Sequence, residues 1–459
     1  MMGLAALLVV IAYFSTQYFV IKQANSHGGS QRMMRQVIYC LSVAASGSSW
    51  VYFGSAGYAA KHGIEFVGLY IGIVLAFTLG FPVLEKIVQL SKAEGIKSIS
   101  DFIGARYGKS FSVAAVVTII TTIGLIPYIS LQMTAIHYLV EVFCGSFDPH
   151  TSNETVSEHL LVGMVEIGIA SYTIFYSAYT PHFKEQYDGL VHALAFATFA
   201  KFVGFVCVGI AAVTFLFGSP VEIFARVMAQ REHLLAFQSP VSISNSLGFV
   251  LIGAASVLLL PNQFYVTIVQ NRNASELRTA RWFVPLLLLG FGIFIMPLAL
   301  IGSTVLPPSA SADFYFLSLP LAAGHNWLAI IAFAGGLPAA TTMIIAPSIL
   351  LSIMISNDLI LPGMLRRTEH SSSHGPKDFT KIIPNIRRAA LIGILVAAFA
   401  YQFVVSVQID FAAMALVSAV AVIQLLPPLL GGLLWRRGTA RGAIWGMAAG
   451  FSVWAYTMV

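Results

Sequence analysis

Leu41 to Gly57 reads LSVAASGSSWVYFGSAG and lies inside an apolar run that is long enough to cross a bilayer. The middle of this stretch, Ala44 to Ser49, contains no large aliphatic side chain, and its glycine and serines hold a helix poorly. Open backbone is tolerated in hydrocarbon only where protein or a water-filled cavity surrounds it. We therefore expect a helix that unwinds near the membrane midplane and turns its carbonyl groups toward a bound ion. The alternative is an intact helix whose small residues allow close packing against a neighbouring helix.

The composition is that of an integral membrane protein. Of the 459 residues, 58% are hydrophobic and only 10% are charged, whereas a soluble domain carries about 25% charged residues. The net charge of +6 does not indicate nucleic-acid binding, because the basic residues are spread over several loops. The three cysteines lie in or beside apolar runs and lack the spacing of zinc ligands or of a disulfide framework.

Apolar runs of spanning length predict an all-α membrane protein of about twelve transmembrane helices, forming a single domain over residues 1–459. They lie near residues 3–22, 37–60, 64–90, 111–144, 159–180, 187–217, 246–270, 279–305, 326–356, 388–407, 410–435 and 442–459. Most lysines and arginines fall in alternate loops, which places those loops inside the cell and the amino terminus outside.

The seventh run, residues 246–270, is interrupted as well. Gly253 to Ser256 lie in its middle, and Pro261 to Gln263 follow them. Interruptions at matching positions in the two halves of a transporter indicate inverted repeats that meet at a binding site.

We therefore expect spans 2–6 and spans 7–11 to form two five-helix repeats, over residues 37–217 and 246–435. The first span with its following loop (1–36) and the last span (436–459) would be peripheral.

The ninth span offers further oxygen ligands for an ion at the first interruption, because the hydroxyl groups of Thr341 and Thr342 lie deep within it. Threonines in membrane helices often bond the carbonyl four residues earlier, and this is the structural alternative. Gly335, Gly336 and Pro338 loosen the same helix, so we favour a cation site shared between the two threonines and the first interruption.

Five motifs make the chain resemble the sodium/solute symporter family over nearly its whole length. In chain order they are SISDFIGARYGKS (98–110), PYISLQ (127–132), LPNQFYVTIVQNR with ELRTARW (260–272 and 276–282), AATTMIIAPSILLSIMISND (339–358) and LLPPLLGGLLWRRGTARGAIWGMAAGFSVWAY (425–456). The resemblance is greatest to the subgroup fused at its carboxyl end to a sensor histidine kinase. It implies the leucine-transporter type of inverted repeat and a place in the bacterial inner membrane.

The resemblance also implies a sodium site. In this family, backbone carbonyls of the first core helix and hydroxyls of the eighth bind the ion, and here these match Ala44, Gly47, Thr341 and Thr342. Ser46 stands where some sodium-coupled members carry an acidic or amide side chain, which leaves sodium and proton coupling both open.

Asp188 matches an acidic residue that the family uses near the ion's cytoplasmic exit. A helix cap, or compensation of the helix dipole, is an equal alternative for an aspartate at a helix start.

Solute contacts in the family come from the first broken helix, the third core helix and the sixth. The residues that match are Trp50, Tyr128, Gln132, Asn262, Gln263 and Phe264. A small polar solute needs a few amide or hydroxyl groups within an aromatic-walled pocket. The alternative for Trp50 and Tyr128 is packing or interfacial anchoring.

Two charged residues are predicted within the membrane, Lys201 in span 6 and Glu166 in span 5. A buried lysine is costly and by default functional. We expect Glu166 or Glu141 as its partner, either for function or to fix the packing of helices.

These observations predict a secondary active transporter that carries a small carboxylate or amino acid together with sodium or a proton. The alternative is a solute-sensing input domain of a histidine kinase whose catalytic part lies beyond residue 459. No enzymatic activity and no cofactor are expected, and the expected partners are the solute, the lipid bilayer and a carboxyl-terminal kinase module.

Overall fold

The computed structural model describes residues 2–26, 32–46, 49–144, 156–179, 183–229, 242–369, 382–405 and 411–458. Within these ranges all regular structure is helical, which confirms the all-α prediction. The first half contains α1 (Met2–Ser26), α2 (Arg32–Val43), α3 (Ser55–His62), α4 (Val67–Thr78), α5 (Phe81–Glu94), α6 (Ile99–Arg106), α7 (Phe111–Cys144), α8 (Val156–Tyr179), α9 (Phe183–Thr214) and α10 (Pro220–Ala229). The second half contains α12 (Ile243–Leu259), α13 (Pro261–Phe264), α14 (Ala274–Val305), α15 (Tyr315–Ala322), α16 (Asn326–Met354), α17 (Leu361–Glu369), α18 (Ile383–Val405), α19 (Phe411–Ile423), α20 (Leu426–Leu434) and α21 (Ala440–Met458).

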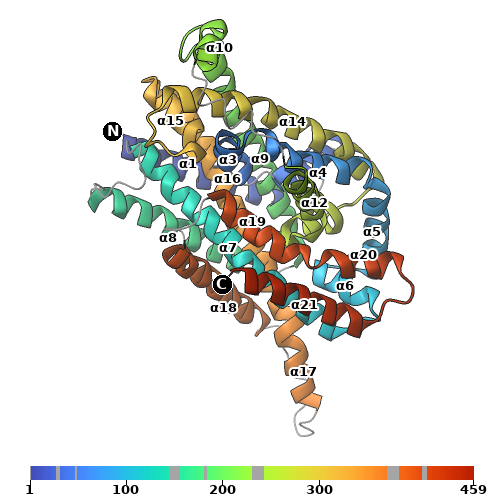
Figure 1. Cartoon of the computed structure of the whole chain (residues 1–459). Coiled ribbons are helices and arrows are strands. Elements are labelled where there is room, and N and C mark those ends of the chain that lie inside the picture. Colours follow the sequence, from blue (N-terminus) through green and yellow to red (C-terminus); the bar gives the residue numbers. More distant parts are fainter. Residues whose placement is uncertain are drawn as a thin grey trace.

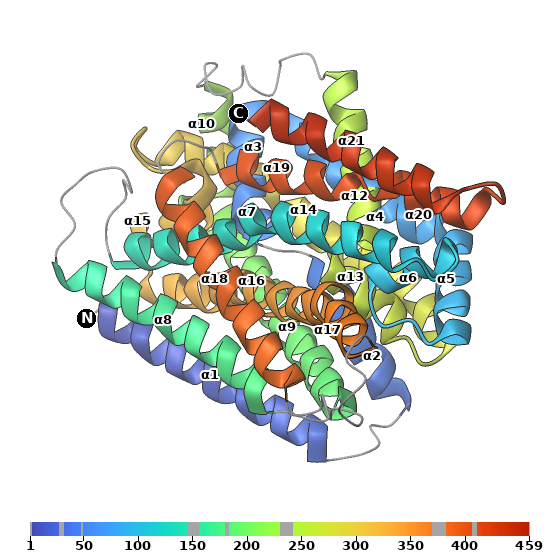
Figure 2. The ribbon, with the colours of Figure 1, turned by 90° about the horizontal axis from the view of Figure 1, so that it is seen from below.

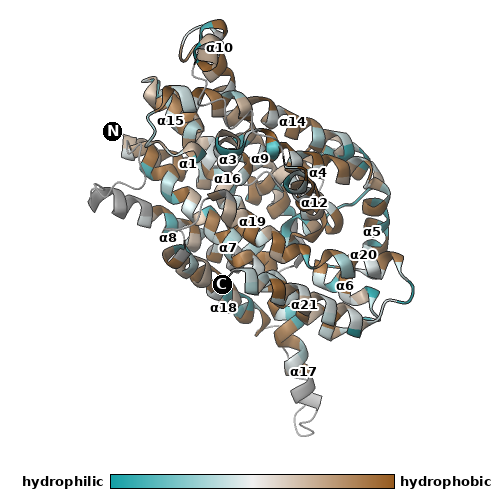
Figure 3. Cartoon of the chain, in the orientation of Figure 1, coloured by the Kyte–Doolittle hydropathy of each residue, from teal (hydrophilic) through white to brown (hydrophobic). Residues whose placement is uncertain are grey.

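The chain is a multi-pass membrane protein. Its described residues contain eight helices that are long and apolar enough to cross a bilayer, or nine when a bent pair counts as one span. Large hydrophobic side chains face outward on these helices, for example Leu286, Leu289 and Ile293 on α14. Figure 3 shows hydrophobic residues along the helices on the outside of the bundle as well as inside it. Such an exterior suits lipid and not water. The expected number of twelve spans stays a prediction.

The centre of the bundle is built on α16. This helix packs against both α7 and α9, and it is the most buried of the candidate spans. Figure 2 shows α1 and α8 together at one edge of the bundle and α20 and α21 toward another. α10 and α17 project from opposite sides in Figure 1. The central position of α16 places Thr341 and Thr342 in the interior, where both are buried.

The first broken helix consists of α2, a 3₁₀ turn η1 (Ala44–Ser46), a π-helical turn η2 (Trp50–Gly54) and α3. The regular α-helix therefore ends at Val43, next to the stretch of small residues, as the sequence predicts. Two tyrosines anchor it on either side of the interruption. The Tyr39 hydroxyl donates to the carbonyl of Thr267 at 2.6 Å, and the Tyr52 hydroxyl donates to the carbonyl of Ala332 on α16 at 3.0 Å.

The second broken helix consists of α12, α13 and a π-helical turn η4 (Tyr265–Val269), and the chain bends by 56° between α12 and α13. Leu260 at the bend is extended, with φ −68° and ψ 126°. Pro261 is the cause, because proline lacks an N–H and pushes the preceding residue out of the α region. The predicted interruption at Gly253 to Ser256 is wrong, since these residues lie within regular α12.

The small residues of α12 serve close packing against α4. A Cβ atom added to Gly253 would overlap the carbonyl oxygen of Leu69, and one added to Gly72 would overlap the carbonyl oxygen of Val250. The two helices thus approach each other backbone to backbone through glycines from both sides, which is a common arrangement in membranes. Both broken helices carry a π-helical turn after the break, and in the second one α13 comes between the break and the turn. The inverted repeat itself, with its boundaries at 37–217 and 246–435, stays a prediction.

We predict that Gly253→Val lowers thermal stability by about 1–3 kcal/mol, the usual cost of overpacking a tight interface. The measurement is the loss of helical circular dichroism on heating in detergent. Gly248→Val on the same helix is the control, because no atom lies within 4 Å of a Cβ at that position. Equal stability of the two variants would contradict the proposed contact.

Candidate functional site

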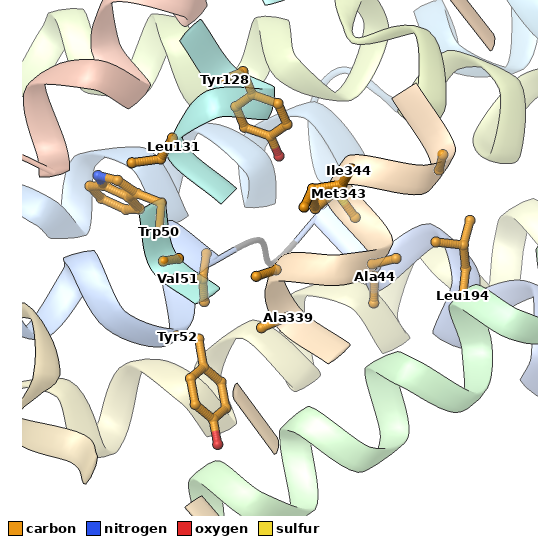
Figure 4. Packing of buried hydrophobic residues seen from close by; sticks show 14 of the residues in the cluster. Ala44, Trp50, Val51, Tyr52, Tyr128, Leu131, Leu194, Ala339, Met343 and Ile344 are labelled. Atoms are coloured by element: carbon orange, nitrogen blue, oxygen red, sulfur yellow. The ribbon is translucent and has the colours of Figure 1, made fainter. Parts of the chain in front are cut away.

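The candidate cation site lies at the break in the first broken helix. Ala44 is buried in η1, which packs against α9. Figure 4 shows Ala44 between Leu194 of α9 and the segment of α16 that carries Ala339, Met343 and Ile344. Of the other expected residues on this helix, Gly47 lies outside the described residues, and only the backbone of Ser46 is described, in η1.

Thr341 and Thr342 each bond the carbonyl four residues earlier in their own helix, which is the expected alternative to binding an ion. The Thr341 hydroxyl donates to the carbonyl of Leu337 at 2.9 Å, and the Thr342 hydroxyl donates to the carbonyl of Pro338 at 2.7 Å. Each hydroxyl oxygen keeps lone pairs that can still accept a hydrogen bond or bind a cation. The sodium site at Ala44, Gly47, Thr341 and Thr342 therefore stays a prediction.

Two residues of α1 reach this region, and neither is among the predicted site residues. The Tyr13 hydroxyl shares a hydrogen bond of 2.9 Å with the Thr341 hydroxyl, and the Gln17 amide donates to Tyr13 at 2.8 Å. Both side chains are buried. A tyrosine and a glutamine at i and i+4 share one helix face, and this spacing was the available signal. The first helix thus contributes side chains to the interior beside α16.

Lys201 contacts the break directly. Its Nζ donates to the carbonyl oxygen of Ala45 at 3.2 Å, and the side chain is only 1% exposed. The expected pairing with Glu166 is not what the structure shows. Glu166 accepts a 3.5 Å hydrogen bond from Gln402 of α18 and lines a separate apolar cavity of about 330 Å³ between α7, α8, α16 and α18. Every residue carries a backbone carbonyl, so the sequence does not single out Ala45 as the partner of Lys201.

Trp50 and Tyr128 line one cavity of about 90 Å³. Its other walls come from α4, α12 and α19 and are mostly aliphatic; the residues are Val51, Leu69, Ile73, Ile252, Ala255, Ser256, Leu259, Leu260, Ala415, Leu416, Ser418, Ala419, Val422 and Ile423. Figure 4 shows Trp50 and Tyr128 beside the break. The volume is below the roughly 300 Å³ at the lower end for ligand pockets, so in this conformation the cavity admits only a small solute.

The four remaining solute candidates lie outside this cavity. Gln132 is next to the break, because its Oε1 accepts a hydrogen bond from the Ser49 N–H at 3.4 Å. Asn262 contacts Met343 of α16 through an N–H···S bond of 3.5 Å. Phe264 packs on Phe102 of α6, with ring centroids 5.8 Å apart. Gln263 is buried on the same turn, α13. The structure thus brings Trp50 and Tyr128 together and keeps Phe264 at a helix contact.

Asp188 is held in an ion-pair cluster between α2, α9 and the start of α14. Arg272 Nη2 donates to both carboxylate oxygens of Asp188 at 2.6 Å, and Arg35 Nη1 lies 3.7 Å from Oδ1. Arg35 also lies 3.5 Å from Glu276, whose carboxylate completes the capping box of α14 with Asn273. α9 begins at Phe183, so Asp188 is not a helix cap. We call these four charged residues, Arg35, Asp188, Arg272 and Glu276, the Asp188 cluster.

Comparison with known proteins shows the fold. The structure of a Na⁺-coupled sialic acid symporter in its substrate-bound, outward-open state aligns with a TM-score of 0.67 and 12% identity, over 99% of this chain and 98% of that chain. The manganese transporter of Eremococcus coleocola aligns with a TM-score of only 0.40 and 10% identity, over 94% of this chain and 95% of that one. No protein-family model matches the sequence, and no curated protein matches it either. The chain therefore shares the fold of that symporter, and the likeness concerns the fold alone.

We predict that Asp188→Asn loosens the contact between α2 and α9, because it leaves Arg35 and Arg272 facing each other without their shared anion. Partly exposed ion pairs contribute about 0–1 kcal/mol, and 1 kcal/mol changes an opening equilibrium about fivefold. The reporter is Cys40, which is buried on α2. Its labelling by a membrane-permeant maleimide, with Cys144 and Cys207 replaced by serine, should become up to about fivefold faster.

The control is Glu94→Gln, which removes the 3.1 Å pair between Glu94 and Arg106, outside the cluster. This pair has similar exposure to the Asp188 carboxylate and connects α5 with α6 only. A labelling rate that rises equally in both variants, or in neither, would show that the cluster does not hold α2 closed.

Proposed function

We propose that this chain is a secondary active transporter that moves a small organic solute, such as a carboxylate or an amino acid, together with a cation. One observation carries the proposal: a single cavity is lined by both broken helices. Trp50 and Val51 follow the first break, and Leu259 and Leu260 form the second. Binding sites at paired helix breaks are the signature of transporters built from repeats.

The chemistry of the cavity supports a solute with a small apolar part. Aliphatic side chains of α4, α12 and α19 form most of the wall, and Trp50 and Tyr128 add two aromatic rings. Polar groups of the solute would be bound at the breaks, where backbone groups are free of helical hydrogen bonds. The Ser418 hydroxyl, which has no hydrogen-bond partner among the described residues, offers a further polar contact in the wall.

Alternating access is supported by the position of the Asp188 cluster. It lies at the ends of α2, α9 and α14, and its pairs with Asp188 are partly exposed to solvent, whereas Glu276 is buried. Contacts of this kind are weak enough to open and close during a transport cycle. By the predicted orientation, the cluster would close the cytoplasmic side.

Membership of the sodium/solute symporter family is part of the proposal. It is supported by the five motifs and by the fold shared with a Na⁺-coupled sialic acid symporter. The coupling cation is sodium or a proton. The sensory alternative would use the same cavity, and solute binding without net transport would favour it over the transporter.

The test is uptake of labelled small acids and amino acids into proteoliposomes, with imposed sodium or proton gradients. We predict that Trp50→Ala weakens solute affinity by about 10- to 100-fold, the effect of losing a buried aromatic contact of roughly 1.4–3 kcal/mol. The exposed Trp282 on α14 provides the matched control, because Trp282→Ala removes the same side chain from the lipid-facing surface. An unchanged Michaelis constant in Trp50→Ala would show that Trp50 only packs. No uptake of any solute would refute transport.

A further inference from the structure

The most unusual contact in the membrane interior is that of Lys201. It lies within the apolar span Asp188–Thr214 and is almost fully buried. Charged side chains in such positions are expensive and are retained for a function. The ammonium donates to the carbonyl of Ala45, inside the 3₁₀ turn where the regular helix has ended.

The packing of α9 against α16 shows which turn of α16 lies beside Lys201. A Cβ on Gly335 of α16 would lie 3.3 Å from the Cα of Gly204 on α9, so these residues are adjacent. Leu194 of α9 shares a small cavity with Thr342 and Ile345 of α16. Lys201 lies between Gly204 and Leu194 along α9, and it is therefore level with the turn of α16 that ends in Thr341 and Thr342.

The ammonium thus bonds the break, and the backbone of Lys201 is level with the turn of α16 that carries the threonines. Its acceptor, Ala45, directly follows Ala44, whose carbonyl is an expected sodium ligand. Carbonyl groups at the end of a helix carry the negative end of its dipole and attract a cation. Lysine brings such a cation with three donors on a long side chain. A sodium ion in the same place would meet a like charge in a medium of low dielectric constant, where repulsion is strong.

We propose that the Lys201 ammonium is a fixed cation that takes the place of sodium at the first helix break. The break is then stabilised by the protein's own charge, and the residues Ala44, Thr341 and Thr342 do not form a sodium site while Lys201 is present. Only the transport measurement rests on the proposed function, because the binding of sodium to the protein is measured without a solute.

The experiment uses the full chain in detergent and compares sodium chloride with choline chloride at equal ionic strength. Equilibrium binding of radioactive sodium and the melting temperature are measured for the wild type, Lys201→Met and Lys201→Gln. The glutamine variant removes the charge but keeps an N–H group for Ala45, so it guards against a methionine variant that fails to fold. Lys86→Gln is the control, because Lys86 also donates to a backbone carbonyl, that of Leu433, on another part of the molecule.

We expect no saturable sodium binding and no sodium-dependent rise in melting temperature for the wild type or Lys86→Gln. Removal of the Lys201 charge should create both, because a ligand that binds only the folded state stabilises it. Saturable sodium binding to the wild type would overturn the proposal. Folded Lys201 variants that bind no sodium and show no sodium-dependent rise in melting temperature would also overturn it, since Lys201 would then only fix the packing of α9.

The second measurement is solute transport in proteoliposomes. Coupled ligands usually change each other's affinity by about 5- to 150-fold, and we expect replacement of sodium by choline to change wild-type solute affinity by less than about fivefold. A larger sodium effect would overturn the fixed cation while leaving transport intact. Absence of transport in every condition would instead refute the proposed function, and the binding measurements would still decide the role of Lys201.

Discussion

The structure depends on one constraint, that backbone polar groups inside hydrocarbon must find partners within the protein. A continuous helix meets it alone, but here the regular α-helix stops before Ala44–Ser46, and Pro261 in the second break lacks the N–H of a helical hydrogen bond. The groups around the first break find partners on other helices. Lys201 donates to the Ala45 carbonyl, and Gln132 accepts from the Ser49 N–H. A break in one helix therefore requires particular side chains on α7 and α9.

The same requirement explains why α16 lies at the centre. Its glycines let the first broken helix come close, since a Cβ on Gly335 would overlap the Tyr52 hydroxyl and one on Gly336 would lie 2.6 Å from the Phe53 ring. Tyr52 then bonds the carbonyl of Ala332. Farther along α16, Thr341 meets Tyr13 of α1. Small residues thus admit the neighbouring helix, and hydroxyl groups fix its position.

The sequence predicted the features that have a local cause and missed those that depend on a partner. The first break could be predicted because Ala44 to Ser49 lack any strong helix former. The second was predicted at two places, and only the one at Pro261 bends the chain. The small residues from Gly253 to Ser256 stay helical, because small residues serve close packing as well as unwinding. Burial of charge made Lys201 a candidate, yet its acceptor is a backbone carbonyl, which every residue carries and no pattern singles out.

The contacts that hold the first broken helix differ in strength along its length, and this decides where it can move. At one end Arg35 binds Asp188 and Glu276, and the Asp188 side chain is 31% exposed, so solvent screens that pair to about 0–1 kcal/mol. At the break the polar partners are buried, and leaving such a group without a partner costs about 1–3 kcal/mol. Separating Arg35 from Asp188 therefore costs less than opening the break, whereas separating Arg35 from Glu276, whose side chain is only 1% exposed, carries the cost of a buried group. The 3₁₀ turn at Ala44–Ser46, where the regular helix α2 has ended, is the place where a bend can be absorbed.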